Sequence, residues 1–421
     1  MRKIFILSLF LFAFILTSPS QKTQLLHFYV ETGNFQRINT PVSVDIEGVI
    51  KSDTLSFRLF EKVNGKMVEK SYQTEPGYIP RLWFILDGTT APGRSREYFL
   101  YKDVKEPESV ISILSVVTPE DIIVKKGSAE ILHYRTAIMY PPANVDTAYK
   151  RSGFIHPVKT PAGNVLTRIN APDHYHHVGI WNPWTKVKIN DHVTDFWNLN
   201  TKQGTVKFAG INATVNGSVF GGFSVKQDHI DFQGSEPEEL AINEVWDVRA
   251  WNVEPVPGIN AYLVDLTTFL SVAGRGQIIF EAYRYGGGIG IRTNEEWNRD
   301  NSTVLTSEGK TRKDADGTRA RWTDLNGAFE NKGNSGITFF SHPANREFPE
   351  PMRVWPENQN GRGDLYFEFC PIRHKEWVLD PGNVYRLKYR MLVYDGKIDS
   401  SIAERLWNDF AFPPVVEMLR K

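Results

Sequence analysis

The chain has 421 residues, of which 41% are hydrophobic and 23% charged, as in ordinary globular proteins with a sizeable core. Its 49 basic and 49 acidic side chains cancel, and no block of basic residues concentrates positive charge. Nucleic-acid binding and membrane-surface binding both rely on such a block. Neither nucleic acid nor a membrane is therefore expected as a partner of the mature chain.

Residues 1–20 differ in composition from the rest of the chain. Arg2 and Lys3 give a positive start, and the apolar run from Ile4 to Leu16 is followed by small and polar residues. A run of this length is short for a membrane span and is typical of a secretory signal peptide. The sequence therefore predicts a secreted or periplasmic protein, with an uncleaved N-terminal anchor as the alternative.

Nucleophilic catalysis by cysteine or serine has little support. Cys370 is the only cysteine, which excludes an internal disulfide, and its apolar surroundings in FEFCPI favour a small buried hydrophobe. Ser152 in RSGF lacks the G-x-S-x-G pattern of a nucleophile elbow. The chemistry has to be sought among other side chains.

Short strands separated by Gly, Pro, Asn and Asp clusters are expected along most of the chain. Residues 24–105 contain β-branched and aromatic runs, with Asn64-Gly65 as a hairpin turn, and predict a small antiparallel sandwich. The polar stretch around residues 105–108 is the expected boundary. It separates an N-terminal β-sandwich domain, 24–107, from a larger domain, 108–421.

The strand pattern continues beyond this boundary and predicts a large pair of packed antiparallel sheets. A helix is expected only near the end, from Ser401 to Phe410. Its apolar residues recur at helical spacing, and Pro413-Pro414 follow it. The predicted fold class is therefore mainly β.

Polar and aromatic side chains gather between Tyr149 and Asn198. This stretch holds five of the ten histidines together with several tryptophans, aspartates and an arginine. Such a mixture exceeds what packing requires and indicates a functional site. Indole rings stack on the apolar faces of sugars and also fill cores. The candidate substrate-binding residues in this stretch are Arg151, His156, Trp181, Trp184 and Trp197.

The densest part of this stretch is Asp173-His174-Tyr175-His176-His177. On a regular strand His174 and His176 share one face, where two imidazoles can hold a divalent or transition metal with a third ligand from elsewhere. Without a metal, one histidine acts as general acid or base while Arg151 holds an anion. A third interpretation is structural, with the imidazoles hydrogen bonded to loop carbonyls.

A second polar group extends from residue 280 to residue 322. Glu281 and Tyr283 share one face of a strand, and Arg284 faces the other way. Glu308 and Lys310 flank a glycine in an expected turn. Tyr283, Arg284 and Lys310 complete the substrate-binding candidates. The candidate catalytic residues of the whole chain are His174, His176, His177, Asp195, Glu281 and Glu308.

The runs YKRSGFIHPVKTPAGNVLT, DHYHHVGIW, DFWN, EAYRYGGGIGIR and DGTRARW resemble the bacterial PmoA-like domain family, over about residues 28–415. Tyr175 stands where the family more often has proline, and Val178 where it often has a basic residue or histidine. The family carries the label "methane oxygenase PmoA" and is in effect a domain of unknown function. A true methane monooxygenase subunit of this kind has many membrane-spanning helices, which this chain lacks after its signal.

Bacteria that degrade polysaccharides often carry this family, and the resemblance implies a galactose-mutarotase-like super-sandwich. That fold hosts sugar epimerases, lyases and hydrolases, so the expected function is an exported carbohydrate-active enzyme of hydrolase or lyase type. Hydrolysis would use a pair of carboxyl groups. Elimination would use a His or Tyr base with Arg151 or Arg284 as charge neutraliser. The alternatives are a metal-dependent oxidase or hydrolase using His174 and His176, and a non-catalytic glycan-binding protein.

Overall fold

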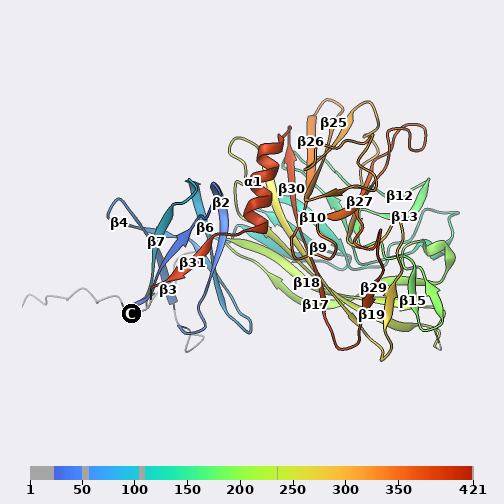
Figure 1. The fold of residues 1–421 in the computed structure, drawn as a ribbon, viewed down its shortest axis with the longest axis horizontal. Helices are drawn as coiled ribbons and strands as arrows, with labels where there is room; N and C mark the ends of the chain where they lie inside the picture. The colour runs from blue at the N-terminus through green and yellow to red at the C-terminus, as the bar shows by residue number, and fades with distance from the viewer. Residues whose placement is uncertain (1–22, 50–55, 104–109, 235, 420–421) are drawn as a thin grey trace, which may run out of the picture.

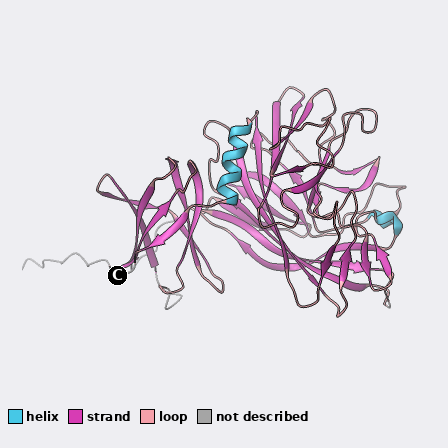
Figure 2. Ribbon diagram, viewed as in Figure 1, coloured by secondary structure: helices cyan, strands magenta, loops and turns pink. Residues whose placement is uncertain are grey.

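The computed structural model describes residues 23–49, 56–103, 110–234 and 236–419. The regular structure of this part of the chain consists almost entirely of antiparallel strands, which confirms the predicted β-sandwich class (Figure 2). None of its helices is long and apolar enough to cross a membrane. The predicted signal peptide and the predicted boundary at residues 105–108 lie outside the described residues.

Two antiparallel sheets pack together at the N-terminal end, in the orders β31-β1-β7-β3-β4 and β2-β6-β5. Alternate residues such as Phe28, Leu82 and Leu100 are fully buried between them. The predicted hairpin forms at Asn64-Gly65, where both residues have the positive φ that a tight two-residue turn requires. The strands are β1 (Gln24–Glu31), β2 (Arg37–Asp45), β3 (Ser56–Val63), β4 (Lys66–Lys70), β5 (Tyr72–Glu75), β6 (Arg81–Thr90), β7 (Ser95–Asp103) and β31 (Val415–Met418).

The rest of the body contains an eight-stranded sheet of long strands, in the order β17-β18-β19-β20-β30-β26-β25-β23. Each strand pairs antiparallel with its neighbours. Its strands are β17 (Gly204–Val215), β18 (Phe220–Asp231), β19 (Glu239–Trp251), β20 (Ala261–Val272), β23 (Ser302–Thr306), β25 (Trp322–Phe329), β26 (Gly333–Ser341) and β30 (Tyr385–Asp395).

A nine-stranded sheet faces it, in the order β24-β27-β28-β22-β14-β11-β10-β9-β8. Side chains of both sheets, such as Ile180 and Ile291 from one and Val225 and Phe339 from the other, form one buried core. The strands are β8 (Ile113–Val117), β9 (Asp121–Lys126), β10 (Ala129–Arg135), β11 (Phe154–Val158), β14 (Ile180–Trp181), β22 (Ile289–Arg292), β24 (Arg319–Ala320), β27 (Glu350–Val354) and β28 (Tyr366–Phe369).

Short elements connect the strands at the edge where the polar residues gather. A two-stranded sheet pairs β12 with β13, and a four-stranded sheet has the order β16-β15-β21-β29. Two 3-10 turns, η1 and η2, flank them. Their bounds are β12 (Ile169–Ala171), β13 (His174–Val178), β15 (Val187–Ile189), β16 (His192–Thr194), β21 (Ile278–Phe280), β29 (Trp377–Leu379), η1 (Thr147–Tyr149) and η2 (Leu199–Thr201).

The C-terminal segment joins the N-terminal sheets to the larger body. The predicted helix forms as α1 (Ser400–Ala411), capped by Asp399, and lies between the two parts in Figure 1. The chain then returns to the N-terminal sheet, because β31 pairs antiparallel with β1. Arg37 of β2 makes a buried ion pair with Asp409 of α1, at 2.9 Å. The final residues therefore complete a sheet whose other strands come from the first hundred.

Replacing Asp409 by alanine should lower the free energy of unfolding by about 3–5 kcal/mol, because it leaves the buried Arg37 and the partly buried Arg405 without their carboxylate. The matched control is Glu295→Ala, which removes a mostly exposed partner of Arg168 and should cost less than about 1 kcal/mol. Urea unfolding of both variants checks this. Equal losses in the two variants would contradict the proposed role of the buried pair.

Candidate functional site

Three imidazoles of β13 lie against one another. The ring of His177 stacks on that of His174 with centroids 4.7 Å apart, and the His176 ring lies 4.8 Å from His177 and 5.4 Å from His174. These three residues are called the imidazole cluster below. Tyr149 of η1 borders it, with its ring 6.4 Å from His176 and 5.6 Å from Tyr175.

The predicted alternation of faces along this strand is wrong for His177. A regular strand would place His177 opposite His174 and His176, yet it contacts both. The pairing of β12 with β13 explains this, because Ala171 pairs with His174 while Ile169 pairs with Val178. Three residues of β12 (169–171) thus span five of β13 (174–178), and such a bulge redirects side chains.

His174 is oriented by a carboxylate that is itself held by a buried arginine. Its Nδ1 lies 2.8 Å from Asp173 Oδ2, and Arg292 of β22 donates both Nη1 and Nη2 to the two oxygens of Asp173, each at 2.9 Å. Arg292 is 1% exposed and also reaches Asp364, at 3.2 Å. Asn360 donates to Asp173 as well, at 2.6 Å. A bidentate pair of this kind fixes both distance and orientation.

Burial sets the protonation of the cluster. It lowers the pKa of His176 to about 3, with a further contribution from His174, and it lowers the pKa of His177 well below the ordinary value. Burial alone would raise the pKa of Asp173, but the hydrogen bond from His174 and the charge of Arg292 outweigh it and the pKa is lowered. At neutral pH two neutral imidazoles therefore lie beside an ionised carboxylate.

Aromatic rings form the floor beneath the imidazoles. His177 stacks on Tyr366 of β28 with centroids 4.9 Å apart, and Trp355 lies 5.5 Å from His177 and 5.0 Å from His174. The hydroxyl of Tyr366 donates to Glu368, at 2.7 Å. Burial raises the pKa of Glu368 to about 8, despite the hydrogen bonds it accepts from Tyr366 and Gly286. A carboxyl group with a raised pKa is thus hydrogen bonded to the tyrosine on which His177 stacks.

The three tryptophans expected to bind substrate are all buried. Trp184 is 0% exposed and stacks on Phe280 in the main core, at 4.3 Å. Trp181 is also 0% exposed, and Trp197 is 4% exposed with its ring 5.8 Å from that of His177. Trp181 and Trp197 therefore pack behind the cluster, and Trp184 lies in the core. As placed, none offers an open face for stacking a sugar.

Asp195 holds a turn rather than facing the imidazoles. Its two oxygens accept hydrogen bonds from the backbone amides of Trp197 and Asn198, the side chain of Asn198 and the hydroxyl of Thr185, at 2.7–2.8 Å. Four donors occupy its lone pairs, so this carboxylate has little capacity left for a substrate. Its visible role is to place Trp197 against His177.

The second polar group divides between two surfaces. Glu281 and Tyr283 are half-buried, and Lys186 lies over the ring of Tyr283, at 5.2 Å. Arg284 is exposed, with its guanidinium over Tyr285, whose ring contacts Trp197. This part of the group therefore adjoins the cluster through aromatic contacts.

Glu308 and Lys310 belong to a different surface. Glu308 lies 3.7 Å from Arg321, which pairs with Glu404 of α1, and Lys310 pairs with Asp314, at 3.0 Å. The structure does not bring these two residues to the imidazole cluster.

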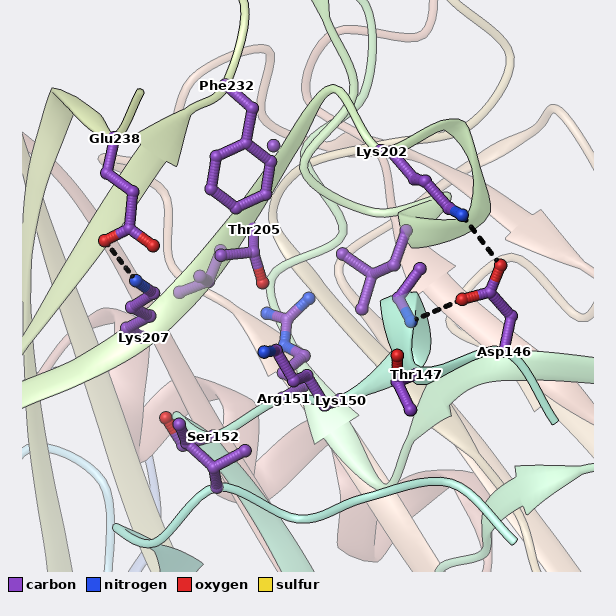
Figure 3. Close-up of a pocket in the computed structure, with 15 residues that line it drawn as sticks. Asp146, Thr147, Lys150, Arg151, Ser152, Lys202, Thr205, Lys207, Phe232 and Glu238 are labelled. Atoms are coloured by element: carbon purple, nitrogen blue, oxygen red, sulfur yellow. Dashed lines mark hydrogen bonds and ion pairs between the residues drawn. The ribbon is translucent and has the colours of Figure 1, made fainter. Parts of the chain in front are cut away.

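Two further predicted residues lie on β11 and in the segment before it. His156 accepts or donates a 2.9 Å hydrogen bond with Thr167, and burial, with Arg135 and His133, lowers its pKa to about 4. Arg151 is 3% exposed and lines a cavity of about 390 Å³ shown in Figure 3. The cluster and this cavity thus lie close to the same chain segment.

A metal site would need a third ligand beside His174 and His176. Within the ranges that the structure describes, no three or more His, Cys, Asp or Glu side chains are arranged to hold a metal ion. Asp173, the carboxylate closest to His174, is already engaged by Arg292 and Asn360. The contacts that hold the cluster are the hydrogen bond from His174 to Asp173 and the ring contacts among the three imidazoles.

Residues 121–408 match a family described as a family of unknown function, DUF6807. The chain belongs to DUF6807. The matched region contains the imidazole cluster, the Arg292–Asp173 pair and the aromatic floor. No curated protein matches the chain. The expectation of a domain of unknown function agrees with this family, whose description carries no PmoA-like label.

Several residues of this candidate site were not among the candidates predicted from the sequence. Asp173 precedes the histidines and is visible in the motif, but its role depends on Arg292, which is more than a hundred positions away in the GIGIR run. A buried arginine on an otherwise apolar strand was the available signal, because such a cation requires a carboxylate partner. The others are Trp355, Asn360, Asp364, Tyr366 and Glu368.

Glu368→Gln should flatten the dependence of stability on pH. A carboxyl group with a folded pKa near 8 and an unfolded pKa near 4.5 stabilises the fold below about pH 4.5 and loses that contribution as pH rises toward 8. The free energy of unfolding of the wild type should therefore fall relative to the variant, by up to about 4 kcal/mol between about pH 5 and pH 8. Urea titrations at the two pH values measure it.

The measurement at about pH 5 serves as a control for the comparison of wild type with Glu368→Gln. At about pH 5 both side chains are uncharged, and the two proteins should differ by less than about 1.5 kcal/mol. If the free energies of unfolding of wild type and variant changed with pH in parallel, Glu368 would be ionised in the folded protein, which would contradict the raised pKa.

Proposed function

We propose that this DUF6807 protein is an exported carbohydrate-active enzyme of lyase type, in which His174 moves the proton. The observation that carries the proposal is the half-exposed His174 imidazole, 31% exposed, hydrogen bonded to an aspartate that a buried arginine holds in place. Imidazole–carboxylate pairs of this kind serve as general acids and bases. The finer resemblance to PmoA-like proteins of polysaccharide-degrading bacteria supports the carbohydrate class.

The hydrogen bond selects the tautomer of His174. Asp173 is ionised and can only accept, so the proton lies on Nδ1 of His174 and the lone pair on Nε2. Nε2 makes no hydrogen bond with the described residues, and it can therefore take a proton from a substrate. Asp173 then stabilises the imidazolium that forms.

The carboxylates favour elimination over hydrolysis. Glycoside hydrolysis commonly needs two carboxyl groups on either side of the bond that breaks. Asp195 is occupied by four donors, Glu308 lies on another surface, and Asp173 is paired with Arg292. Of the candidate carboxylates this leaves Glu281 alone, without the second carboxyl group that hydrolysis commonly needs. Elimination needs instead one base, one proton donor and one cation, and we assign these parts to His174, Tyr149 and Arg284.

Tyr149 and Arg284 supply the other two parts. Burial, with the charges of Asp146 and Tyr175, raises the pKa of Tyr149, so its phenol keeps a proton that can pass to a leaving oxygen. Arg284 is exposed and forms no ion pair with described residues, which leaves it able to neutralise a substrate carboxylate. His174 takes the proton from the carbon beside that carboxylate, a C=C bond forms, and the C–O bond to the leaving sugar breaks.

His174→Gln should lower kcat on a uronate-containing polysaccharide by about 10²–10⁴-fold, because the base is lost. Asp173→Asn should also lower kcat, since an amide can donate to Nδ1 and favour the wrong tautomer. Appearance of the unsaturated uronate, followed by its ultraviolet absorbance over a panel of acidic polysaccharides, is the measurement. His192→Gln is the matched control, because His192 pairs with Asp231 away from the cluster.

Three outcomes would count against the proposal. Release of reducing ends without a new double bond would indicate hydrolysis. Loss of activity on treatment with a chelator would favour a metal-dependent enzyme. Measurable affinity without turnover over the whole panel would favour a glycan-binding protein.

A further inference from the structure

The cavity of about 390 Å³ lies between η1, η2 and the start of β17 (Figure 3). Its volume falls in the range of about 300–1,000 Å³ that is usual for pockets that bind small molecules. None of the three imidazoles lines it. The role proposed for His174 therefore leaves this cavity unexplained.

Positive charge exceeds negative charge in the lining. Lys202 pairs with Asp146 at 2.9 Å, and Lys207 pairs with Glu238 at 2.7 Å, as the dashed lines in Figure 3 show. Two cations of the lining, Lys150 and Arg151, have no carboxylate partner among the described residues. The lining thus carries two more positive than negative side chains, and Glu244, which does not line the pocket, offsets part of the charge of Arg151.

Arg151 is the more unusual of the two cations. It is 3% exposed, its Nη1 donates to the carbonyl oxygen of Phe196 at 3.3 Å, and its buried Nε has no hydrogen-bond partner. Burial lowers its pKa to about 10, partly offset by Glu244, so it remains charged at neutral pH. Glu244 already accepts hydrogen bonds from Trp246 and His229. A buried guanidinium with unused donors fits a planar, bidentate anion.

The remaining lining suits a hydroxylated ring. Thr147 and Thr205 offer hydroxyl groups, and the ring of Phe232, 37% exposed, borders the cavity. Hydroxyls that exchange hydrogen bonds, together with one aromatic face, are the groups that recognise a sugar.

We propose that this cavity is a second binding site, specific for a sugar carboxylate, in which Arg151 and Lys150 bind the carboxylate and Phe232 packs against the sugar ring. The specificity for an anion is inferred from the charged residues of the pocket alone, whereas the choice of a sugar rests on the proposed function. The site is separate from the imidazole cluster, so an acidic product or an acidic end of a chain can bind while His174 is occupied or absent.

Calorimetric titration with glucuronate tests the proposal, with glucose as the neutral analogue and inorganic phosphate as the alternative anion. Wild-type protein should bind glucuronate and bind glucose at least about tenfold more weakly, because glucose lacks the charge-assisted hydrogen bonds. Lys150→Ala and Phe232→Ala change exposed side chains and should each weaken glucuronate binding about tenfold. Lys202→Ala is the matched control, since Asp146 already pairs with that lysine, and should change affinity less than about threefold.

Two further variants separate this site from the proposed reaction and from a folding defect. His174→Gln should keep its glucuronate affinity while losing turnover. Arg151→Met should lose glucuronate binding, and Arg151→Lys should keep part of it with an unchanged far-ultraviolet spectrum.

Some results would overturn the site. One is the absence of glucuronate binding to the wild type at millimolar concentration, and another is an affinity of the wild type for glucose or phosphate equal to that for glucuronate. The others are an unchanged glucuronate affinity in Lys150→Ala and a loss of glucuronate binding in His174→Gln.

Discussion

The bidentate ion pair between Arg292 and Asp173 is the interaction on which the candidate site depends. Arg292 is 1% exposed on β22, where an unpaired guanidinium would carry a large desolvation cost. Its partner Asp173 lies beside His174, and the same guanidinium reaches Asp364 while Asn360 donates to Asp173. One buried cation thus connects the β13 hairpin, the nine-stranded sheet and the loop before β28. The orientation of His174 follows from this network, because Asp173 has no freedom to turn away.

Burial then divides the histidines into two kinds. His176 and His177 lie among Tyr149, Trp197 and Tyr366, and their depressed pKa values keep them neutral. His174 lies at the rim, with one nitrogen on a carboxylate and the other open. Neutral rings around His174 form a low-dielectric support, in which the contact with Asp173 is its main electrostatic interaction. The aromatic floor and the Arg292–Asp173 pair therefore act together.

Local patterns in the sequence predicted the β class, the Asn64-Gly65 hairpin and the C-terminal helix, because turn chemistry and helical spacing are short-range properties. They also identified the imidazole cluster. They did not predict the bulge in β13, the return of β31 to β1, or the long-range partner of Asp173, since each depends on pairing between distant segments. Residue type also could not show that the indoles are buried or that Asp195 is saturated by hydrogen bonds. Carboxylates and tryptophans look alike in a sequence whether they face solvent or the core.

Long-range proton–nitrogen NMR spectra of histidine-labelled protein test the central claim most directly. At neutral pH the account predicts that His174 carries its proton on Nδ1, and that His176 and His177 are uncharged. In Arg292→Met the Nδ1 preference of His174 should be lost while the tautomers of distant histidines such as His27 stay as they were. A His174 ring protonated on Nε2 in the wild type, or an unchanged His174 spectrum in Arg292→Met, would contradict the claim that the buried arginine sets the chemistry of the site.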